Sequence, residues 1–381
     1  MKCNGVETSS SDFIGIEGAP LITHVDSLLE PARDGIFITP GFIDLQVNGF
    51  AGVDYNSPTS PLENIARSIR TMFSTGVTRF FPTVITGSPE DMLGALQNLA
   101  FARETLVEGP AMEAFHVEGP HISPHDGPRG AHPARWVRPP DFEEFKRWQE
   151  AAQGNVRLVT LSPEWPEAPH YIDQLALEGV VTSIGHTRAT KQQIADAVRA
   201  GATLSTHLGN GADAALPRHP NYIWEQLAED KLAASFIVDG IHLPDSFLNV
   251  ALRAKGVERS VLITDAVMPA MCAPGPYRLG EVEVELKEDQ RVVLRGGTRL
   301  AGSSLRMDAA ISNVMRAAKL SLTEAIAMAT VNPARVGRIA GRLRGLRPGD
   351  RSDVVRFRVE DGCVRVVETY LAGERVFAAS L

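Results

Sequence analysis

One pattern repeats along the middle of the chain: a short apolar segment, a turn, and then a longer amphipathic stretch. The apolar segments are strand candidates, because each is short and bounded by turn residues. They occur eight times, at 41–49, 77–86, 114–120, 156–164, 180–187, 202–210, 233–242 and 260–267. Stretches between them carry apolar residues at three- and four-residue spacing, which predicts helices, for example at 61–76, 190–201 and 244–256.

Strands that alternate with helices predict a parallel sheet. Eight such units within about 230 residues match the usual size of a (β/α)8 TIM-like barrel. A doubly wound open sheet is the alternative. No glycine-rich dinucleotide-binding motif follows the first strand, and the notable polar residues stand where strands end, which favours the barrel. We therefore expect an α/β protein whose functional residues lie at the C-terminal rim of a barrel.

The two ends of the chain differ from its middle. Residues 1–39 and 340–381 are rich in short alternating segments, and together they predict one small β-sandwich domain formed from both termini. The barrel then occupies residues 40–339. A hairpin-like insert at 282–297 separates the eighth strand from a helix that begins near Ser304.

Composition narrows the class of protein. The 381 residues are 44% hydrophobic, which allows a large core, and the formal net charge is −8. Without a long Lys/Arg run the chain lacks the basic face that nucleic acids require, so we expect a small-molecule partner.

No signal-peptide core and no span of roughly 18 apolar residues is present, so we expect a cytoplasmic protein with no membrane association. Cys3, Cys272 and Cys363 form no CxxC pattern and predict no disulfide framework.

Four polar residues stand at the ends of different predicted strands: Glu118 in FHVEGP, His186 in GHT, His207 in THLGN and Asp265 in LITDAV. Any one alone could be a packing or capping residue, but a closed barrel brings all four to one rim. A carboxylate and two imidazoles suit zinc or iron(II), and three protein ligands leave a position open for water. Asp265 returns across the mouth, where it could act as a general base. The combination predicts metal-dependent amide hydrolysis.

At these residues the chain resembles the N-acetylglucosamine-6-phosphate deacetylases of the amidohydrolase superfamily. The likeness covers nearly the whole chain. In the family's order it includes PGFIDLQVNG (40–49), HVEGPHISP followed by GAH (130–132), GHTRAT (185–190), THLGN (206–210), DGIHL (239–243), TDA (264–266), LAGSSLRM (300–307) and ATVNPARVG (329–337). The resemblance implies an enzyme that deacetylates N-acetylglucosamine 6-phosphate to glucosamine 6-phosphate and acetate.

Carried over to this chain, the resemblance implies metal ligands at Glu118, His186 and His207 and the catalytic acid/base at Asp265. It implies one divalent metal per subunit, with zinc favoured over iron. Arg218 matches an arginine that reaches the phosphate of the neighbouring subunit's substrate, which implies a homodimer; otherwise it is an exposed loop residue. The expected substrate contacts are Ala131, His132, Asn210, Gly211, Arg218, His242, Leu300, Ala301 and Gly302.

The chain also differs from many superfamily members in its first strand, and from its own family in two loops. Gln46 and Asn48 stand where many superfamily members have H-x-H for a second metal, and amides are poor zinc ligands, so we expect a single metal. LGNGA at 208–212 replaces L-F/Y-N-A-M, and RHPN at 218–221 replaces R-E-P-G. The replacement at 208–212 leaves a glycine-rich loop that carries Asp213, and the charge of Asp213 would be unfavourable close to a phosphate. The two loop departures bear on the substrate rather than on the reaction.

Two other functions are compatible with the sequence. A deacylase for another N-acyl compound would keep the four rim residues and change only the pocket. Its substrate could be N-acetylgalactosamine 6-phosphate, an unphosphorylated amino sugar or an N-acyl amino acid. A catalytically inactive barrel, retained as an assembly subunit, would be expected to lose one of the four residues, and here all four positions are filled.

Overall fold

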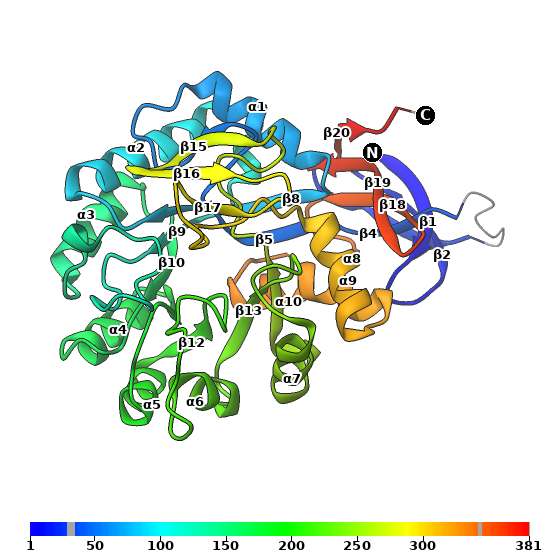
Figure 1. The fold of residues 1–381 in the computed structure, drawn as a ribbon. Helices are drawn as coiled ribbons and strands as arrows, with labels where there is room; N and C mark the ends of the chain where they lie inside the picture. Colours follow the sequence, from blue (N-terminus) through cyan, green and yellow to red (C-terminus); the bar gives the residue numbers. More distant parts are fainter. Residues whose placement is uncertain (29–34, 342–344, 381) are drawn as a thin grey trace.

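The centre of the structure is a sheet of eight parallel strands that neighbour one another in chain order (Figure 1). The structure is a computed structural model and describes residues 1–28, 35–341 and 345–380. All eight predicted strands are present. They are β5 (Phe42–Val47), β8 (Val77–Ile85), β9 (Phe115–Glu118), β10 (Val156–Leu161), β11 (Val181–Ile184), β12 (Ala202–Ser205), β13 (Ala233–Ile237) and β14 (Ser260–Ile263). Nearly every residue in them is buried, because one face fills the barrel and helices cover the other.

The sheet closes because β14 returns beside β5. The backbone N–H of Asp265 donates to the carbonyl of Gln46 at 3.0 Å, and the N–H of Asn48 donates to the carbonyl of Ala266 at 2.8 Å. Val47 and Ala266 form a parallel bridge at the same place. The (β/α)8 barrel is therefore confirmed and the open doubly wound sheet is excluded.

Helices connect the strands and surround the barrel (Figure 1). They are α1 (Leu62–Phe73), α2 (Pro89–Thr105), α3 (Phe142–Ala151), α4 (Ala168–Leu177), α5 (Lys191–Ala200), α6 (Tyr222–Ala228), α7 (Asp245–Lys255), α8 (Met307–Ala318), α9 (Leu322–Ala329) and α10 (Val331–Val336). The predicted helices at 61–76, 190–201 and 244–256 are α1, α5 and α7. A capping box of Thr190 and Gln193 begins α5. None of the helices in the described ranges is long and apolar enough to cross a membrane.

Strands from both ends of the chain form a second, seven-stranded sheet. They are β1 (Lys2–Glu7), β2 (Phe13–Glu17), β3 (His24–Ser27), β4 (Phe37–Pro40), β18 (Val354–Glu360), β19 (Cys363–Leu371) and β20 (Glu374–Ala378). Antiparallel pairing of β4 with β18 joins the N-terminal strands to the C-terminal ones. Its strands share a small core that includes Cys3, Ile16, Ile38 and Val354. The predicted association of strands from both termini is thus confirmed, and these strands form one continuous hydrogen-bonded sheet.

The insert after β14 contains one strand more than the predicted hairpin. Its antiparallel strands are β15 (Gly275–Leu279), β16 (Val282–Leu286) and β17 (Val292–Leu294). Leu279 and Val284 of this sheet pack in one apolar cluster with Ile85, at the end of β8, and with Ala301. The insert therefore lies over the rim of the barrel. The remaining short elements are β6 (Gly49–Phe50), β7 (Val53–Asp54), and the 3₁₀ turns η1 (Gly109–Ala111), η2 (Ala134–Trp136) and η3 (Val257–Arg259).

A buried ion pair joins the terminal sheet to the barrel. Nε of Arg79, in β8, donates to Oδ2 of Asp353 at 2.8 Å, and Nε of Arg351 donates to the same oxygen at 2.7 Å. Oδ1 of Asp353 accepts from the backbone N–H of Ala372 at 2.9 Å. The side chain of Asp353 is 0% exposed and that of Arg79 is 5% exposed. Glu113 also pairs with Arg79, at 3.4 Å, so removal of Asp353 would leave two guanidinium groups with a single, more distant carboxylate.

We predict that Asp353→Asn lowers the free energy of unfolding by about 3–5 kcal/mol, because two guanidinium groups lose their buried anion. Urea unfolding followed by circular dichroism measures the change. Asp230→Asn is the matched control, since it removes a carboxylate from an ion pair whose aspartate side chain is 83% exposed, and its effect should be small. Equal losses in the two variants would show that the buried pair does not hold the sheet to the barrel.

Candidate active site

A cavity of about 330 Å³ opens at the C-terminal rim of the barrel, and all four rim residues singled out from the sequence line it. Glu118 is the last residue of β9. His186, His207 and Asp265 each stand two positions after the last residue of their strand, β11, β12 and β14. Because the strands are parallel, these equivalent positions lie at the same end of the barrel.

His186, His207 and Asp265 share an unusual backbone conformation. Their φ angles are 49°, 31° and 51°. Residues with a side chain rarely adopt this left-handed region, and the conformation persists only where the surrounding structure holds it. The chain turns over at the same point after three different strands. This repeated strain marks the rim as a functional site rather than a set of ordinary strand ends.

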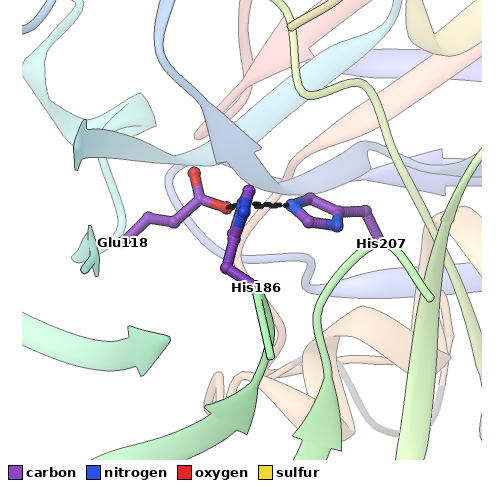
Figure 2. A group of neighbouring side chains, drawn as sticks. All are labelled: Glu118, His186 and His207. Atoms are coloured by element: carbon purple, nitrogen blue, oxygen red, sulfur yellow. Dashed lines mark hydrogen bonds and ion pairs between the residues drawn. The ribbon is translucent and has the colours of Figure 1, made fainter. Parts of the chain in front are cut away.

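Figure 2 shows the side chains of Glu118, His186 and His207 pointing toward one another. Oε1 of Glu118 lies 3.2 Å from Nε2 of His186 and 3.0 Å from Nε2 of His207, and the two Nε2 atoms are 3.1 Å apart. Ligand atoms around a tetrahedral zinc ion with bonds of about 2.0–2.1 Å stand roughly 3.3 Å from each other. The three atoms therefore have nearly the separation that a shared divalent cation requires.

The hydrogen bonds and charges of this cluster also suit a cation. Nδ1 of His186 lies 2.8 Å from the carbonyl oxygen of Pro128, so Nδ1 carries the proton and Nε2 presents its lone pair to the cluster. Burial would raise the pKa of Glu118, but the adjacent imidazoles of His186 and His207 hold that pKa well below its usual range, so the carboxylate is ionised. Lone pairs that converge in a buried site repel each other unless positive charge lies between them. The donor set fits one divalent metal.

Asp265 stands beside the cluster and is held by the first strand. Nε2 of Gln46 and Nδ2 of Asn48 both donate to its Oδ1, at 3.1 and 2.7 Å. The two amides at the positions of second-metal histidines thus bind the carboxylate of Asp265. Burial, followed by the charge of Glu118, raises the pKa of Asp265 to about 6. A cation at the cluster would oppose the charge of Glu118 and lower that pKa again.

Most of the expected substrate contacts line the same cavity: Ala131, His132, Asn210, Gly211, His242, Leu300, Ala301 and Gly302. Arg218 does not line it. It is exposed in the loop before α6 and, within the described ranges, its guanidinium forms no hydrogen bond or ion pair. The structure therefore brings together every expected site residue of one subunit except this arginine.

Two further histidines at the cavity have their rings fixed by hydrogen bonds. Nδ1 of His242 donates to Oδ2 of Asp239 at 2.6 Å, and Oδ1 of Asp239 accepts from two backbone N–H groups of the same turn, both at 2.8 Å. Nδ1 of His132 lies 2.8 Å from Oγ1 of Thr86, and its ring meets the His186 ring edge-on at 4.4 Å between centroids. Burial, followed by the charge of His186, lowers the pKa of His132 to about 3, so this ring is neutral.

The glycine-rich loop at 208–212 is more closely packed than its sequence indicates. A Cβ atom at Gly209 would come within 2.7 Å of the Phe247 ring and 2.8 Å of Leu243. Phe247 therefore occupies the space next to this loop position, where the family pattern has an aromatic residue. A Cβ at Gly211 would lie 2.8 Å from Nδ1 of His186, so the loop backbone rests against a metal-ligand ring.

The charge of Asp213 is neutralised by an arginine of the same chain. Nε of Arg188 donates to its two carboxylate oxygens at 3.0 and 2.9 Å, and the hydroxyl of Tyr222 donates to Oδ2 at 3.0 Å. The sequence raised the possibility that Asp213 would repel a phosphate. With a guanidinium directly on the carboxylate, that repulsion is largely cancelled.

Several cavity residues were missed by the sequence reasoning: Ile85, Gly127, Gly130, Ala212, Ala214, Ile237, Leu279 and Arg299. Gly127, Gly130, Ala212 and Ala214 are small residues in loops, and Ile85, Ile237 and Leu279 are apolar ends of strands, so no chemical signal marks them. Arg299 did carry a signal, because it directly precedes the LAGSS segment that was expected to contact substrate. Among the described residues that line the cavity it is the only arginine or lysine.

Comparison with known proteins shows which family the chain belongs to. The sequence profile of the Amidohydrolase family matches residues 37–376. The N-acetylglucosamine-6-phosphate deacetylase of Bacillus subtilis is 32% identical over 330 residues, covering 86% of this chain and 82% of that protein. The N-acetylgalactosamine-6-phosphate deacetylase of a Shewanella species is 34% identical over 350 residues, covering 90% and 84%. The structure of a mutant N-acetyl-D-glucosamine-6-phosphate deacetylase from Mycobacterium smegmatis, in complex with N-acetyl-D-glucosamine-6-phosphate, has a TM-score of 0.86 at 30% identity and covers 96% and 95% of the two chains.

We predict that each chain retains one tightly bound divalent ion after gel filtration, measured by elemental analysis, because only Glu118, His186 and His207 form a converging donor set in the part of the chain that the structure describes. His207→Ala should lose that ion, since two donors remain. His170→Ala, at an exposed position of α4, is the control and should retain it. Two ions per chain, or an undiminished metal content in His207→Ala, would contradict the single site.

Proposed function

The chain belongs to the amidohydrolase family, and we propose that it is a metal-dependent deacetylase that converts N-acetylglucosamine 6-phosphate and water to glucosamine 6-phosphate and acetate. The observation that carries the proposal is the cluster of Glu118, His186 and His207 beside Asp265 in one rim cavity. Support for the substrate comes from the named deacetylases, of which the chain covers more than four fifths, at 82% and 84% of their lengths.

Glu118, His186 and His207 would hold the divalent ion in this proposal. Two imidazoles and one carboxylate favour zinc over softer or larger metal ions, and iron(II) is the second choice. At such a site a divalent ion polarises an amide carbonyl and makes water easier to deprotonate at neutral pH. Gln46 and Asn48 donate to Asp265, which supports a single ion rather than two.

Asp265 transfers the proton. It takes a proton from the attacking water and returns it to the nitrogen of the amino sugar, because the amine leaves only after it has been protonated. Gln46 and Asn48 both donate to Oδ1 of Asp265, so Oδ2 is the oxygen that transfers the proton. His132 and His242, each with Nδ1 already in a hydrogen bond, have Nε2 left to contact the substrate.

We also propose a homodimer in which Arg218 of one subunit contacts the phosphate in the other. Arg218 lies outside its own cavity and is exposed, which leaves it able to reach a neighbouring subunit. A guanidinium offers a planar pair of donors that matches a phosphate. A cytoplasmic location is part of the proposal, because the phosphorylated substrate is too strongly charged to cross a bilayer unaided.

A second candidate substrate is N-acetylgalactosamine 6-phosphate. The Shewanella deacetylase named for that epimer is 34% identical to this chain, and the Bacillus subtilis enzyme named for the glucosamine epimer is 32% identical. A panel of the two 6-phosphates and their unphosphorylated forms, run on metal-loaded enzyme, separates these candidates. Preference for an unphosphorylated sugar would contradict both.

We predict that Asp265→Asn lowers kcat on the order of 10²-fold or more, because an amide keeps the shape of the side chain but cannot accept a proton. Metal content should stay near that of the wild type, since Asp265 lies outside the ligand cluster. Asp245→Asn, at the exposed start of α7, is the control and should retain full activity. Turnover near the wild-type rate in Asp265→Asn would assign proton transfer to another residue.

We predict that Arg218→Ala raises KM for the 6-phosphorylated sugar about 10-fold or more, with little change in kcat or in hydrolysis of the unphosphorylated sugar. Mixed dimers give the sharper test. When an Arg218→Ala subunit pairs with an Asp265→Asn subunit, one cavity has Asp265 and receives Arg218 from the other subunit. Co-expressed variants should therefore regain the low KM. If they do not, Arg218 does not act across a subunit interface.

A further inference from the structure

The mouth of the cavity carries an arginine that the mechanism does not use. Arg299 directly precedes Leu300, and among the described lining residues it is the one arginine or lysine. Its side chain is 45% exposed, so the guanidinium lies at the opening and not in the core. A positive group at this place can meet a charged end of a substrate that enters the cavity.

Arg299 is held by an aspartate on the opposite loop. Its Nη1 donates to Oδ1 of Asp126 at 2.8 Å and its Nη2 donates to Oδ2 at 3.1 Å. Nη1 also lies 3.3 Å from the carbonyl oxygen of Gly130, which lines the cavity beside Ala131. The guanidinium thus presents its two-donor edge to the carboxylate of Asp126, which directly precedes the cavity residue Gly127.

The ion pair with Asp126 can be exchanged at low energetic cost. The side chain of Asp126 is 67% exposed, and exposed ion pairs contribute little to stability. Nη2 of Arg129 also donates to Oδ1 of Asp126, at 3.1 Å, so the carboxylate keeps a partner when Arg299 turns away. A phosphate offers the same bidentate acceptor with a larger negative charge.

Asp126 is shared between two arginines, Arg129 and Arg299, whereas Arg188 is already paired with Asp213 and lies near Glu164. The two guanidinium groups at Asp126 carry one positive charge more than this carboxylate neutralises. That local surplus favours a second anion beside Asp126, and Arg299 is the one of the two arginines that lines the cavity.

We propose that Arg299 binds the phosphate of the substrate within its own subunit, and that Asp126 holds the guanidinium in the free enzyme and releases it when the substrate enters. The inference rests on the proposed function, because it assumes a phosphorylated amino sugar in this cavity. It adds a contact from the same chain to the contact proposed for Arg218 across the subunit interface.

A simpler role for the pair is to tie the loop at 124–132 to the loop before Leu300. The two roles predict opposite effects at Asp126. If the pair is a tie, removal of either partner loosens the same loops. If Asp126 competes with the phosphate, its removal frees Arg299 and improves binding.

The experiment compares KM and kcat for a 6-phosphorylated N-acetylhexosamine and its unphosphorylated form on metal-loaded variants. Arg299→Gln should raise KM for the phosphorylated sugar about 10- to 100-fold, with kcat and the unphosphorylated sugar little changed. Arg299→Lys keeps the charge but loses the planar pair of donors, so its KM for the phosphorylated sugar should lie between those of Arg299→Gln and the wild type. Asp126→Asn should lower KM for the phosphorylated sugar.

Arg295→Gln is the matched control. Arg295 lies on the same insert, its side chain is 57% exposed and it pairs with Glu283 at 3.1 Å, but it does not line the cavity. This variant should behave as the wild type. Calorimetric binding of glucosamine 6-phosphate and glucosamine gives a second measurement, and circular dichroism shows whether each variant folds.

Two results would overturn the inference while leaving the deacetylase assignment intact. The first is an unchanged KM in Arg299→Gln when the wild type hydrolyses the phosphorylated sugar. The second is a rise in KM for both sugars in both Arg299→Gln and Asp126→Asn, which is the result of a loop tie. A wild-type enzyme that does not hydrolyse the phosphorylated sugar would instead contradict the proposed function, and the inference with it.

Discussion

The pairing of the first barrel strand with the last is the constraint on which the rest of the site depends. Backbone hydrogen bonds between Gln46 and Asp265 and between Asn48 and Ala266 close the sheet. The same closure brings the amide side chains of Gln46 and Asn48 onto the carboxylate of Asp265. It also sets Asp265 beside Glu118, which ends a strand from the other side of the barrel. In an open sheet these groups would stand far apart.

Electrostatics at the rim shows why such a site needs a rigid support. Lone pairs of Glu118, His186 and His207 converge in a buried place, and a second carboxylate lies close to them. That arrangement is unfavourable without a cation, and left-handed φ angles at His186 and His207 add strain. The closed barrel and the sheet anchored to it through Asp353 supply the compensating stability. Metal binding would then stabilise the fold as well as the reaction.

The strand ends and the loops of the cavity differ in how closely they follow the family pattern. The strand ends keep Glu118, His186, His207 and Asp265. The loop after His207 lacks the family's aromatic residue at Gly209 and carries Asp213, but Phe247 fills the space beside Gly209 and Arg188 pairs with the charge of Asp213. Arg299 stands at the same opening. The departures from the family pattern thus lie in the loops, and the four residues at the strand ends follow it.

The amino-acid sequence by itself determined the eight strands, the barrel and the four residues at its rim. Apolar runs and helical spacing are local signals, and parallel strands must end at one edge, so Glu118 and Asp265 could be predicted to meet. Only the tertiary structure decided which groups touch across the loops. It showed that Gln46 donates to Asp265, that Arg299 lines the cavity, and that Arg218 lies outside the cavity of its own subunit. These contacts join residues far apart in the chain through loop conformations that no periodic pattern specifies.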